Sequence, residues 1–440
     1  IQSKETVFTL GMNFTSCRIT GSGPNEFEFK NFRVKLMKRI EFDIDKSEYS
    51  LTSNNIVFTF DSYRYNFTVL DKRNNKVWIF QDNYNNNMVV FRAKEKRASD
   101  YIQLDLSFFI NNFECNAKYT VYSSEDNSIE FNLSCPSEMP MTTLRYPSQL
   151  SSVTKNDRII LPMNEGISFM ADDFSHSIKS THTYGGHGLC MPFFGLFDDS
   201  DISVKKSGLL YIIKTQNDFR LQIQNISNLQ TFSLNWYSER GQFGGYDRSV
   251  QFIFFNEANH VDLCKRYRQY AIEDGRLVTF EEKQKKFPKI QFDKLIGAAN
   301  IWYFSGPDQL VKVYEELQSF GVNHILASNE NTASNINYMN DEMENILTSR
   351  YDIYQDVLDP ELYKWTKPNQ TPSPFDLQDW PDDIGQKSNG ELIYGWSLKN
   401  VSNPDQMIYM GKLCDKPAIN YAIDRINEEC ITSDDTIRKN

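Results

Sequence analysis

The sequence predicts a large antiparallel β-sandwich followed by a shorter region in which strands and helices alternate and pair in parallel. Two observations carry this prediction. Apolar residues alternate with a period of two up to about residue 285, and a strand–helix–strand unit then begins near residue 294. Many short strands with few helices are typical of a sandwich, whereas a βαβ unit pairs its strands in parallel. We therefore expect a sandwich domain over residues 1–285 and a second domain over residues 286–440.

The first region contains a series of short apolar segments separated by polar turns such as residues 71–75. A stretch at residues 261–272 has apolar side chains at helical spacing instead, so we expect a helix to close this region. The clearest predicted strands are residues 56–60, 65–70, 76–80, 101–110, 209–213 and 250–255.

One hairpin can be predicted together with its register. Residues 115–122 and 128–135 flank a polar five-residue loop. In the register that this loop favours, every pair on one face is apolar, and a shift by one residue would destroy the match. The same register sets Cys115 opposite Cys135 inside the sheet, where a disulfide is geometrically allowed. Two buried free thiols are the alternative, because free cysteine is often buried.

Several features favour an exported glycoprotein. The cysteine pair suits an oxidising compartment, and Asn132 occupies a sequon on the predicted solvent face of the hairpin. No segment approaches the roughly eighteen apolar residues of a membrane span, and a net charge of −11 disfavours nucleic acids as partners. The seven cysteines include no CxxC pair, so we expect no metal site and no cofactor. The sequons lie at Asn13, Asn66, Asn132, Asn225, Asn369 and Asn400.

The second region reads as about three βα units. Its predicted elements are a buried strand at 294–304, a helix that starts at 305–307 and is capped by Gly321, a strand at 322–327, a helix at 341–349, a strand at 350–358 and a helix at 417–429. Three parallel strands cannot close into a barrel and would expose an edge. We therefore expect that the chain continues past Asn440, or that a second chain or a C-terminal fragment completes the domain.

Several short segments occur along this chain in an order that resembles that of a known protein family. They are Leu161-Pro162 with Gly166, GLCMPFFG at 188–195, Trp236 to Arg248, the segment 266–283, LIGAANIW at 295–302 and DIYQD at 352–356. Over about residues 160–430, this order resembles glycoside hydrolase families 101 and 129, the α-N-acetylgalactosaminidases, and their uncharacterised relatives.

The resemblance implies a galactose-mutarotase-like sandwich that precedes the first part of a (β/α)8 TIM-type barrel, truncated here before its fourth strand. It also implies a retaining hydrolase of α-linked glycans or glycoproteins, in which two carboxylates lie about 5 Å apart. Because the nucleophile of these families follows the fourth strand, we expect the catalytic carboxylates beyond residue 440 and assign none here.

Six residues at or near the predicted strand ends are candidates for sugar binding. Carboxylates and amides there can bind hydroxyl groups, and aromatic rings can stack on a sugar face. The alternatives are capping or solvated loop positions for the polar residues and core packing for the tryptophan. Tyr351 stands where relatives carry His, which keeps open a second reading, an inactive glycan-binding or structural component of an extracellular assembly. The candidates are Asp352, Tyr354, Gln355, Asp356, Trp302 and Asn329.

Overall fold

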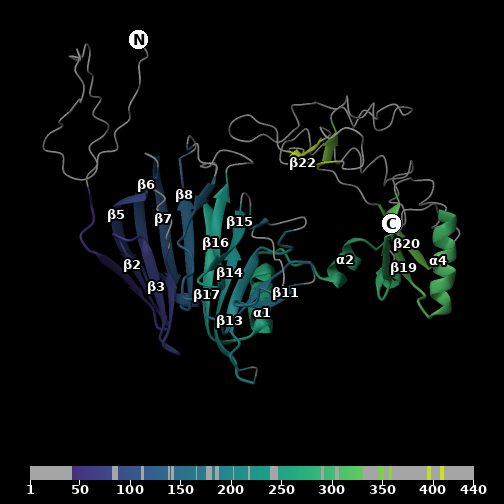
Figure 1. Cartoon of the computed structure of the whole chain (residues 1–440), viewed down its shortest axis with the longest axis horizontal. Coiled ribbons are helices and arrows are strands. Elements are labelled where there is room, and N and C mark those ends of the chain that lie inside the picture. The colour runs from purple at the N-terminus through teal and green to yellow at the C-terminus, as the bar shows by residue number, and fades with distance from the viewer. Residues whose placement is uncertain are drawn as a thin grey trace, which may run out of the picture. The chain divides into compact units, whose positions relative to one another are not determined.

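The computed structural model divides into two units, residues 1–41 and residues 42–440. Everything described below belongs to the second unit, which contains a β-sandwich, a parallel sheet and a small antiparallel sheet (Figure 1). The described residues are 42–81, 88–110, 113–136, 139, 143–164, 166–174, 181–183, 188–201, 203–216, 219–237, 246–288, 292–302, 307–330, 345–350, 356–358, 394–397 and 407–410.

One layer of the sandwich is a nine-stranded antiparallel sheet in the order β11-β10-β13-β14-β17-β8-β7-β6-β5. The 3-10 turn η1 (Ser123–Glu125) lies in the loop between β7 and β8. The strands are β5 (Met88–Arg97), β6 (Tyr101–Ile110), β7 (Phe113–Tyr122), β8 (Ser128–Ser134), β10 (Asp157–Leu161), β11 (Ile167–Met170), β13 (Phe193–Asp198), β14 (Lys206–Ile213) and β17 (Arg248–Ala258).

The other layer consists of two four-stranded antiparallel sheets, β1-β2-β3-β4 and β12-β15-β16-β9. An isolated bridge between Phe80 and Leu150 links the first of them to the segment before β10, and the Thr231 hydroxyl of β16 donates to the Leu150 carbonyl at 2.5 Å. The strands are β1 (Glu48–Thr52), β2 (Ile56–Asp61), β3 (Asn66–Asp71), β4 (Lys76–Phe80), β9 (Thr143–Arg145), β12 (Thr181–Thr183), β15 (Phe219–Ile226) and β16 (Leu229–Tyr237).

Aromatic side chains join the two layers. Phe252 of the nine-stranded sheet meets Phe80 of β4 with ring centroids 5.6 Å apart, and it meets Tyr211 of the neighbouring strand at 5.0 Å. Tyr211 in turn contacts Phe232 of β16 at 5.6 Å. Each such ring removes a large apolar area from water, which stabilises the fold by about 1.5–3 kcal/mol per side chain. The predicted antiparallel β-sandwich is confirmed.

Helix α1 (His260–Glu273) packs on the opposite face of the nine-stranded sheet, against β13, β14 and β17. Its Asn259 cap accepts hydrogen bonds from the backbone amides of Val261 and Asp262. Phe193 stacks on Tyr267 at 4.4 Å, whereas the next residue, Phe194, points into the sandwich and stacks on Tyr211. Phe193 and Phe194 are therefore both apolar because both faces of the sheet are covered here.

The predicted βαβ unit is confirmed. Strands β18 (Ala299–Trp302), β19 (Ile325–Glu330) and β20 (Ile346–Arg350) form a parallel sheet in this order. Helix α4 (Pro307–Ser319) packs Leu310 and Tyr314 on the sheet, and Gly321 adopts a φ of +87° after the helix ends.

Several boundaries predicted for this region are wrong, including that of the second strand, which spans Ile325–Glu330 and not residues 322–327. Residues 292–295 form the short helix α3, and Gly297, with a φ of +77°, turns the chain before β18, so the strand is shorter than expected and only half-buried. Residues 346–350 pair with β19 as a strand, although residues up to 349 were expected in a helix. The third parallel strand is consequently β20 and not residues 350–358. The helix expected at 417–429 lies outside the described residues.

The last described elements form a small antiparallel sheet in the order β21-β23-β22. Its strands are β21 (Asp356–Leu358), β22 (Tyr394–Ser397) and β23 (Met407–Met410).

A further short helix, α2 (Phe280–Lys286), begins at a capping box formed by Thr279 and Glu282. None of the helices within the described part of the chain is long and apolar enough to span a membrane.

Candidate functional site

The six sugar-binding candidates fall into three groups. Trp302 ends β18 and Asn329 lies one residue before the end of β19, so both occupy the carboxyl edge of the parallel sheet. Asp356 is the first residue of β21, in the small antiparallel sheet. Asp352, Tyr354 and Gln355 lie outside the described residues. The structure thus brings two of the six candidates to one sheet edge.

The carboxyl edge of the parallel sheet combines an aromatic ring with polar groups. Trp302 pairs in register with Ser328, and its side chain is 51% exposed. The Ser328 hydroxyl donates to Oδ1 of Asn300 at 2.7 Å, which links the polar groups of the two strands. A half-exposed indole beside a hydrogen-bonded polar pair can stack on a sugar ring.

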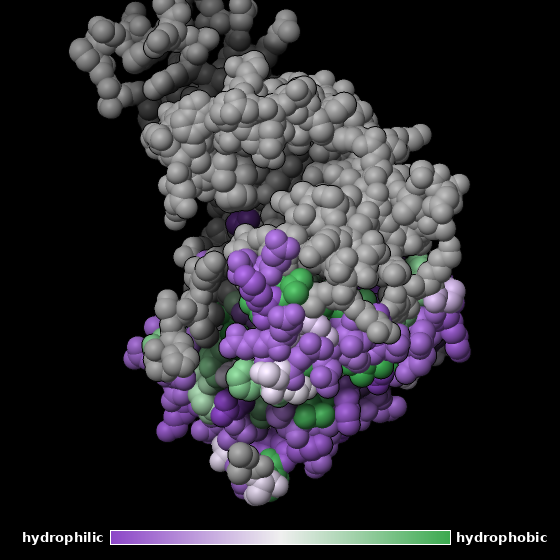
Figure 2. Space-filling model, turned by 90° about the vertical axis from the view of Figure 1, so that its right-hand side faces the viewer, coloured by the Kyte–Doolittle hydropathy of each residue, from purple (hydrophilic) through white to green (hydrophobic). Residues whose placement is uncertain are grey.

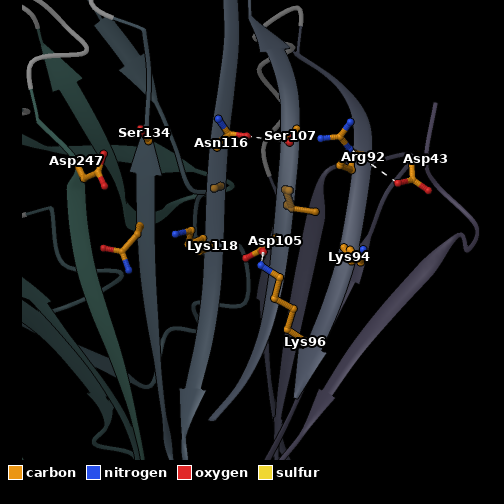
Figure 3. A pocket seen from close by; sticks show the side chains of 13 residues that line it. Asp43, Arg92, Lys94, Lys96, Asp105, Ser107, Asn116, Lys118, Ser134 and Asp247 are labelled. Atoms are coloured by element: carbon orange, nitrogen blue, oxygen red, sulfur yellow. Dashed lines mark hydrogen bonds and ion pairs between the residues drawn. The ribbon is translucent and has the colours of Figure 1, made fainter. Parts of the chain in front are cut away.

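A second polar feature, which the sequence analysis missed, lies on the outer face of the nine-stranded sheet. It is a cavity of about 610 Å³ above β5, β6, β7 and β8, bordered by Asp43 and Asp247. We call it the polar cavity (Figure 3). Asp43 is fixed at its edge by a backbone bridge to Arg92, with the Asp43 amide donating to the Phe91 carbonyl at 2.8 Å.

The strand register arranges the side chains of the polar cavity in two rows across four strands. Because alternate residues of a strand point to the same face, each row holds residues that face outward together. Figure 3 shows these side chains projecting from neighbouring strands into one space. One row runs through Lys94, Asp105, Lys118 and Asn132, and the next through Arg92, Ser107, Asn116 and Ser134.

Hydrogen bonds and ion pairs order part of this cavity. Lys96 and Asp105 form an ion pair at 2.5 Å, and this hydrogen bond raises the pKa of the lysine. The Ser107 hydroxyl donates to Oδ1 of Asn116 at 2.8 Å. Arg92 lies 3.9 Å from Asp43 at the exposed rim, a distance at which the pair adds little stability.

A smaller depression of about 240 Å³ lies beside α1. Two ion pairs lie in it, since Arg266 of α1 binds Glu125 and Lys214 binds Glu130. Gln251 also donates to Glu125 at 2.6 Å. These contacts attach α1 and the β7–β8 loop to the sheet, which assigns this depression a structural role.

The predicted hairpin register is confirmed, because Ala117 pairs with Leu133 and Asn116 with Ser134. Cys115 and Cys135 are both buried and are free thiols in the structure. The neighbouring Cys115 thiol, together with burial, holds the pKa of Cys135 well above its ordinary value. The two sulfur groups are therefore neighbours, and their oxidation to a disulfide stays a prediction.

Three of the predicted glycosylation sites lie within the described residues. Asn225 is exposed near the β15–β16 turn, and Asn66 is half-buried at the start of β3. Asn132 is half-buried on β8, where it lines the polar cavity and donates to Glu130 at 3.3 Å. The predicted solvent-facing position of Asn132 is thus part of a concave surface.

Among the described residues on the face drawn in Figure 2, exposed apolar residues form separate spots between hydrophilic residues and mark no further site. Within the residues that the structure describes, no three His, Cys, Asp or Glu side chains come together as a metal site.

Comparison with known proteins shows a likeness of fold without a likeness of sequence. No family model and no curated protein matches the chain. Among solved structures, the α-N-acetylgalactosaminidase NagBb from Bifidobacterium bifidum in complex with GalNAc superposes with a TM-score of 0.64 at 13% identity, covering 86% of this chain and 67% of that one. Its ligand-free form gives a TM-score of 0.63 at 13% identity, covering 87% and 69%. The chain therefore shares the fold of NagBb over most of its length.

Proposed function

We propose that this chain is a glycoside hydrolase-like protein that recognises α-linked galactose-type glycans at the carboxyl edge of its parallel sheet. The observation that carries the proposal is the fold shared with NagBb, an enzyme solved in complex with GalNAc. The order of the short segments from Leu161 to Asp356 supports the same family independently of the superposition.

A physical argument places the sugar at the carboxyl edge of the parallel sheet. Loops that follow parallel strands converge at this edge, so side chains from successive strands can contact one ligand. Trp302 supplies a half-exposed ring, and Asn300 and Ser328 supply polar groups on the two strands that end beside it. Asp352, Tyr354, Gln355 and Asp356, which follow β20, complete the proposed site.

Hydrolysis by this family type requires two carboxylates, one as the nucleophile and one as the acid/base. We assign neither among the 440 residues, so the proposal concerns glycan recognition first. The proposed setting is extracellular, as the paired cysteines and the sequons suggest. A (β/α)8 barrel that includes β18, β19 and β20 is likewise part of the proposal.

A binding measurement tests the site. We expect α-linked methyl N-acetylgalactosaminide to bind the full chain more tightly than its β-linked form, as measured by calorimetry. Trp302→Ala should weaken this binding roughly two- to tenfold, the range that ring stacking contributes. Tyr63→Ala is the matched control, because Tyr63 is an aromatic residue 67% exposed in the β2–β3 turn. Equal affinity of the two variants, or no preference for the α-linkage, would contradict the proposal.

A second candidate function, glycan binding without hydrolysis, is favoured by Tyr351, which stands where relatives carry a histidine. The two candidates differ in turnover of an α-N-acetylgalactosaminide with a chromogenic leaving group. Release of the chromophore by the full chain identifies a hydrolase, whereas binding without release identifies a glycan-binding protein.

A further inference from the structure

The polar cavity contains cations that the fold does not use. Polar side chains alone are ordinary on the outer face of an antiparallel sheet. Here, however, Lys94 and Lys118 flank Asp105 in the register, while Asp105 forms its ion pair with a third lysine, Lys96. Within the described part of the chain, neither Lys94 nor Lys118 has an ion-pair partner. Two ammonium groups thus face one cavity in a chain whose net charge is −11.

Hydrogen-bonding groups next to these lysines are oriented by their neighbours. Oδ1 of Asn116 accepts the Ser107 hydroxyl at 2.8 Å, which leaves the Asn116 amide hydrogens to donate to a ligand. Nδ2 of Asn132 donates to Glu130 at 3.3 Å, which leaves its Oδ1 as an acceptor. The polar cavity therefore presents donors and acceptors of the kind that bind hydroxyl groups, beside two positive charges.

The dimensions suit one small ligand. Lys94 and Lys118 lie two strands apart, so their Cα atoms are separated by about 10 Å. Their long flexible stems allow both ammonium groups to reach a single anionic group above Asp105. A volume of about 610 Å³ falls within the roughly 300–1,000 Å³ of small-molecule sites.

We propose that the polar cavity binds an anionic saccharide, a sugar that carries a carboxylate or a sulfate group. The anionic group lies between Lys94 and Lys118, and the ring hydroxyls bind Asn116 and, in chains that carry no glycan at Asn132, Oδ1 of Asn132 as well. A neutral sugar fits less well, because it would desolvate the two ammonium groups without bringing them an anionic partner, and none of the described residues that line the cavity is aromatic. This site lies on the sandwich and does not depend on the function proposed for the parallel sheet.

The test is a calorimetric titration of the full chain with methyl glucuronide, galactose 6-sulfate, galactose and inorganic sulfate. We expect one of the two anionic sugars to bind, and which one binds distinguishes a carboxylate from a sulfate. Lys94→Ala and Lys118→Ala should each weaken that binding about tenfold or more, the effect of one charge-assisted hydrogen bond. Lys155→Ala removes an exposed lysine from the turn before β10 and should leave the affinity for that sugar unchanged. Asn116→Ala should weaken binding of the sugar.

Four results would overturn the proposal. Galactose binding as tightly as galactose 6-sulfate and methyl glucuronide would exclude recognition of the charge, and inorganic sulfate binding as tightly as either sugar would exclude recognition of the hydroxyl groups. Affinities of Lys94→Ala and Lys118→Ala equal to that of Lys155→Ala would place the ligand elsewhere. Failure of all four probes to bind would leave the polar cavity as a solvated face.

Discussion

Gly195 is required by a close approach of two strands. It lies on β13 between Ile160 of β10 and Leu210 of β14. A Cβ atom added at this position would lie 2.5 Å from the Leu209 carbonyl oxygen and 3.3 Å from the Leu210 Cα, both of them backbone atoms. β14 cannot move away easily, because its other edge is paired with β17. We therefore predict that Gly195→Ala destabilises the sandwich.

The magnitude follows from two opposing contributions. Overpacking of a closely packed site costs about 1–3 kcal/mol, and each ladder hydrogen bond that lengthens costs about 1 kcal/mol more. Alanine gains about 0.5–1 kcal/mol because it restricts the unfolded chain. The net expectation for Gly195→Ala is a loss of about 2–3 kcal/mol in the free energy of unfolding.

The control is Gly208→Ala on β14. An added Cβ there would meet the Ala258 side chain at 3.0 Å and the Leu196 carbonyl at 3.4 Å, a contact that a small shift relieves. We expect a loss below about 1 kcal/mol for this variant. Urea unfolding followed by tryptophan fluorescence reports on the sandwich through the buried Trp78 and Trp236. Equal stability of Gly195→Ala and the wild-type protein, or a larger loss in Gly208→Ala, would refute the steric argument.

Three further predictions concern buried polar groups. Under oxidising conditions Cys115 and Cys135 should form a disulfide that links their peptides in a non-reduced map; two alkylated thiols would exclude it. Burial raises the pKa of Asp157, so its folded form holds a proton more tightly than its unfolded form. The free energy of unfolding should therefore fall as the pH rises from 3.8 through the raised pKa of folded Asp157. Asp157→Asn should remove this pH dependence when the free energy of unfolding is measured at a series of pH values. Trp236→Phe should cost about 2–4 kcal/mol in urea unfolding, because the Tyr146 carbonyl loses its 2.7 Å hydrogen bond; a change below 1 kcal/mol would contradict this role.

The antiparallel strands were predictable because their signal is local. β4 and β6 begin and end at the predicted residues, and each is bounded by turns. The register of β7 with β8 was predictable because a shift by one residue would expose its apolar face. The order of strands in the sheet was not predictable, since β8 ends at Ser134 and pairs with β17, which begins only at Arg248, and no local pattern specifies that pairing.

The errors in the parallel region have a related cause. Residues 346–350 are short and become a strand by pairing with β19, so their structure depends on a contact distant in sequence. Residues 294–304 form one apolar run, but the positive φ of Gly297 divides it into α3 and β18. Trp302 ends β18 near its predicted position, whereas Asn329, expected in the loop after its strand, lies within β19 because that strand extends to Glu330.

The polar cavity could have been predicted in part. β5, β6, β7 and β8 follow one another in sequence and pair in that order, so the alternation of each strand places Lys94, Asp105, Lys118 and Asn132 in one row. The alternation of polar and apolar residues does not show which part of the outer face of the sheet α1 covers. Because α1 starts at His260, two residues after β17 ends at Ala258, the short connection holds it against β17 and its neighbours β14 and β13. The same connection keeps α1 away from β5, β6 and β7, and this is why polar side chains persist on that half of the sheet and a ligand has room to bind there.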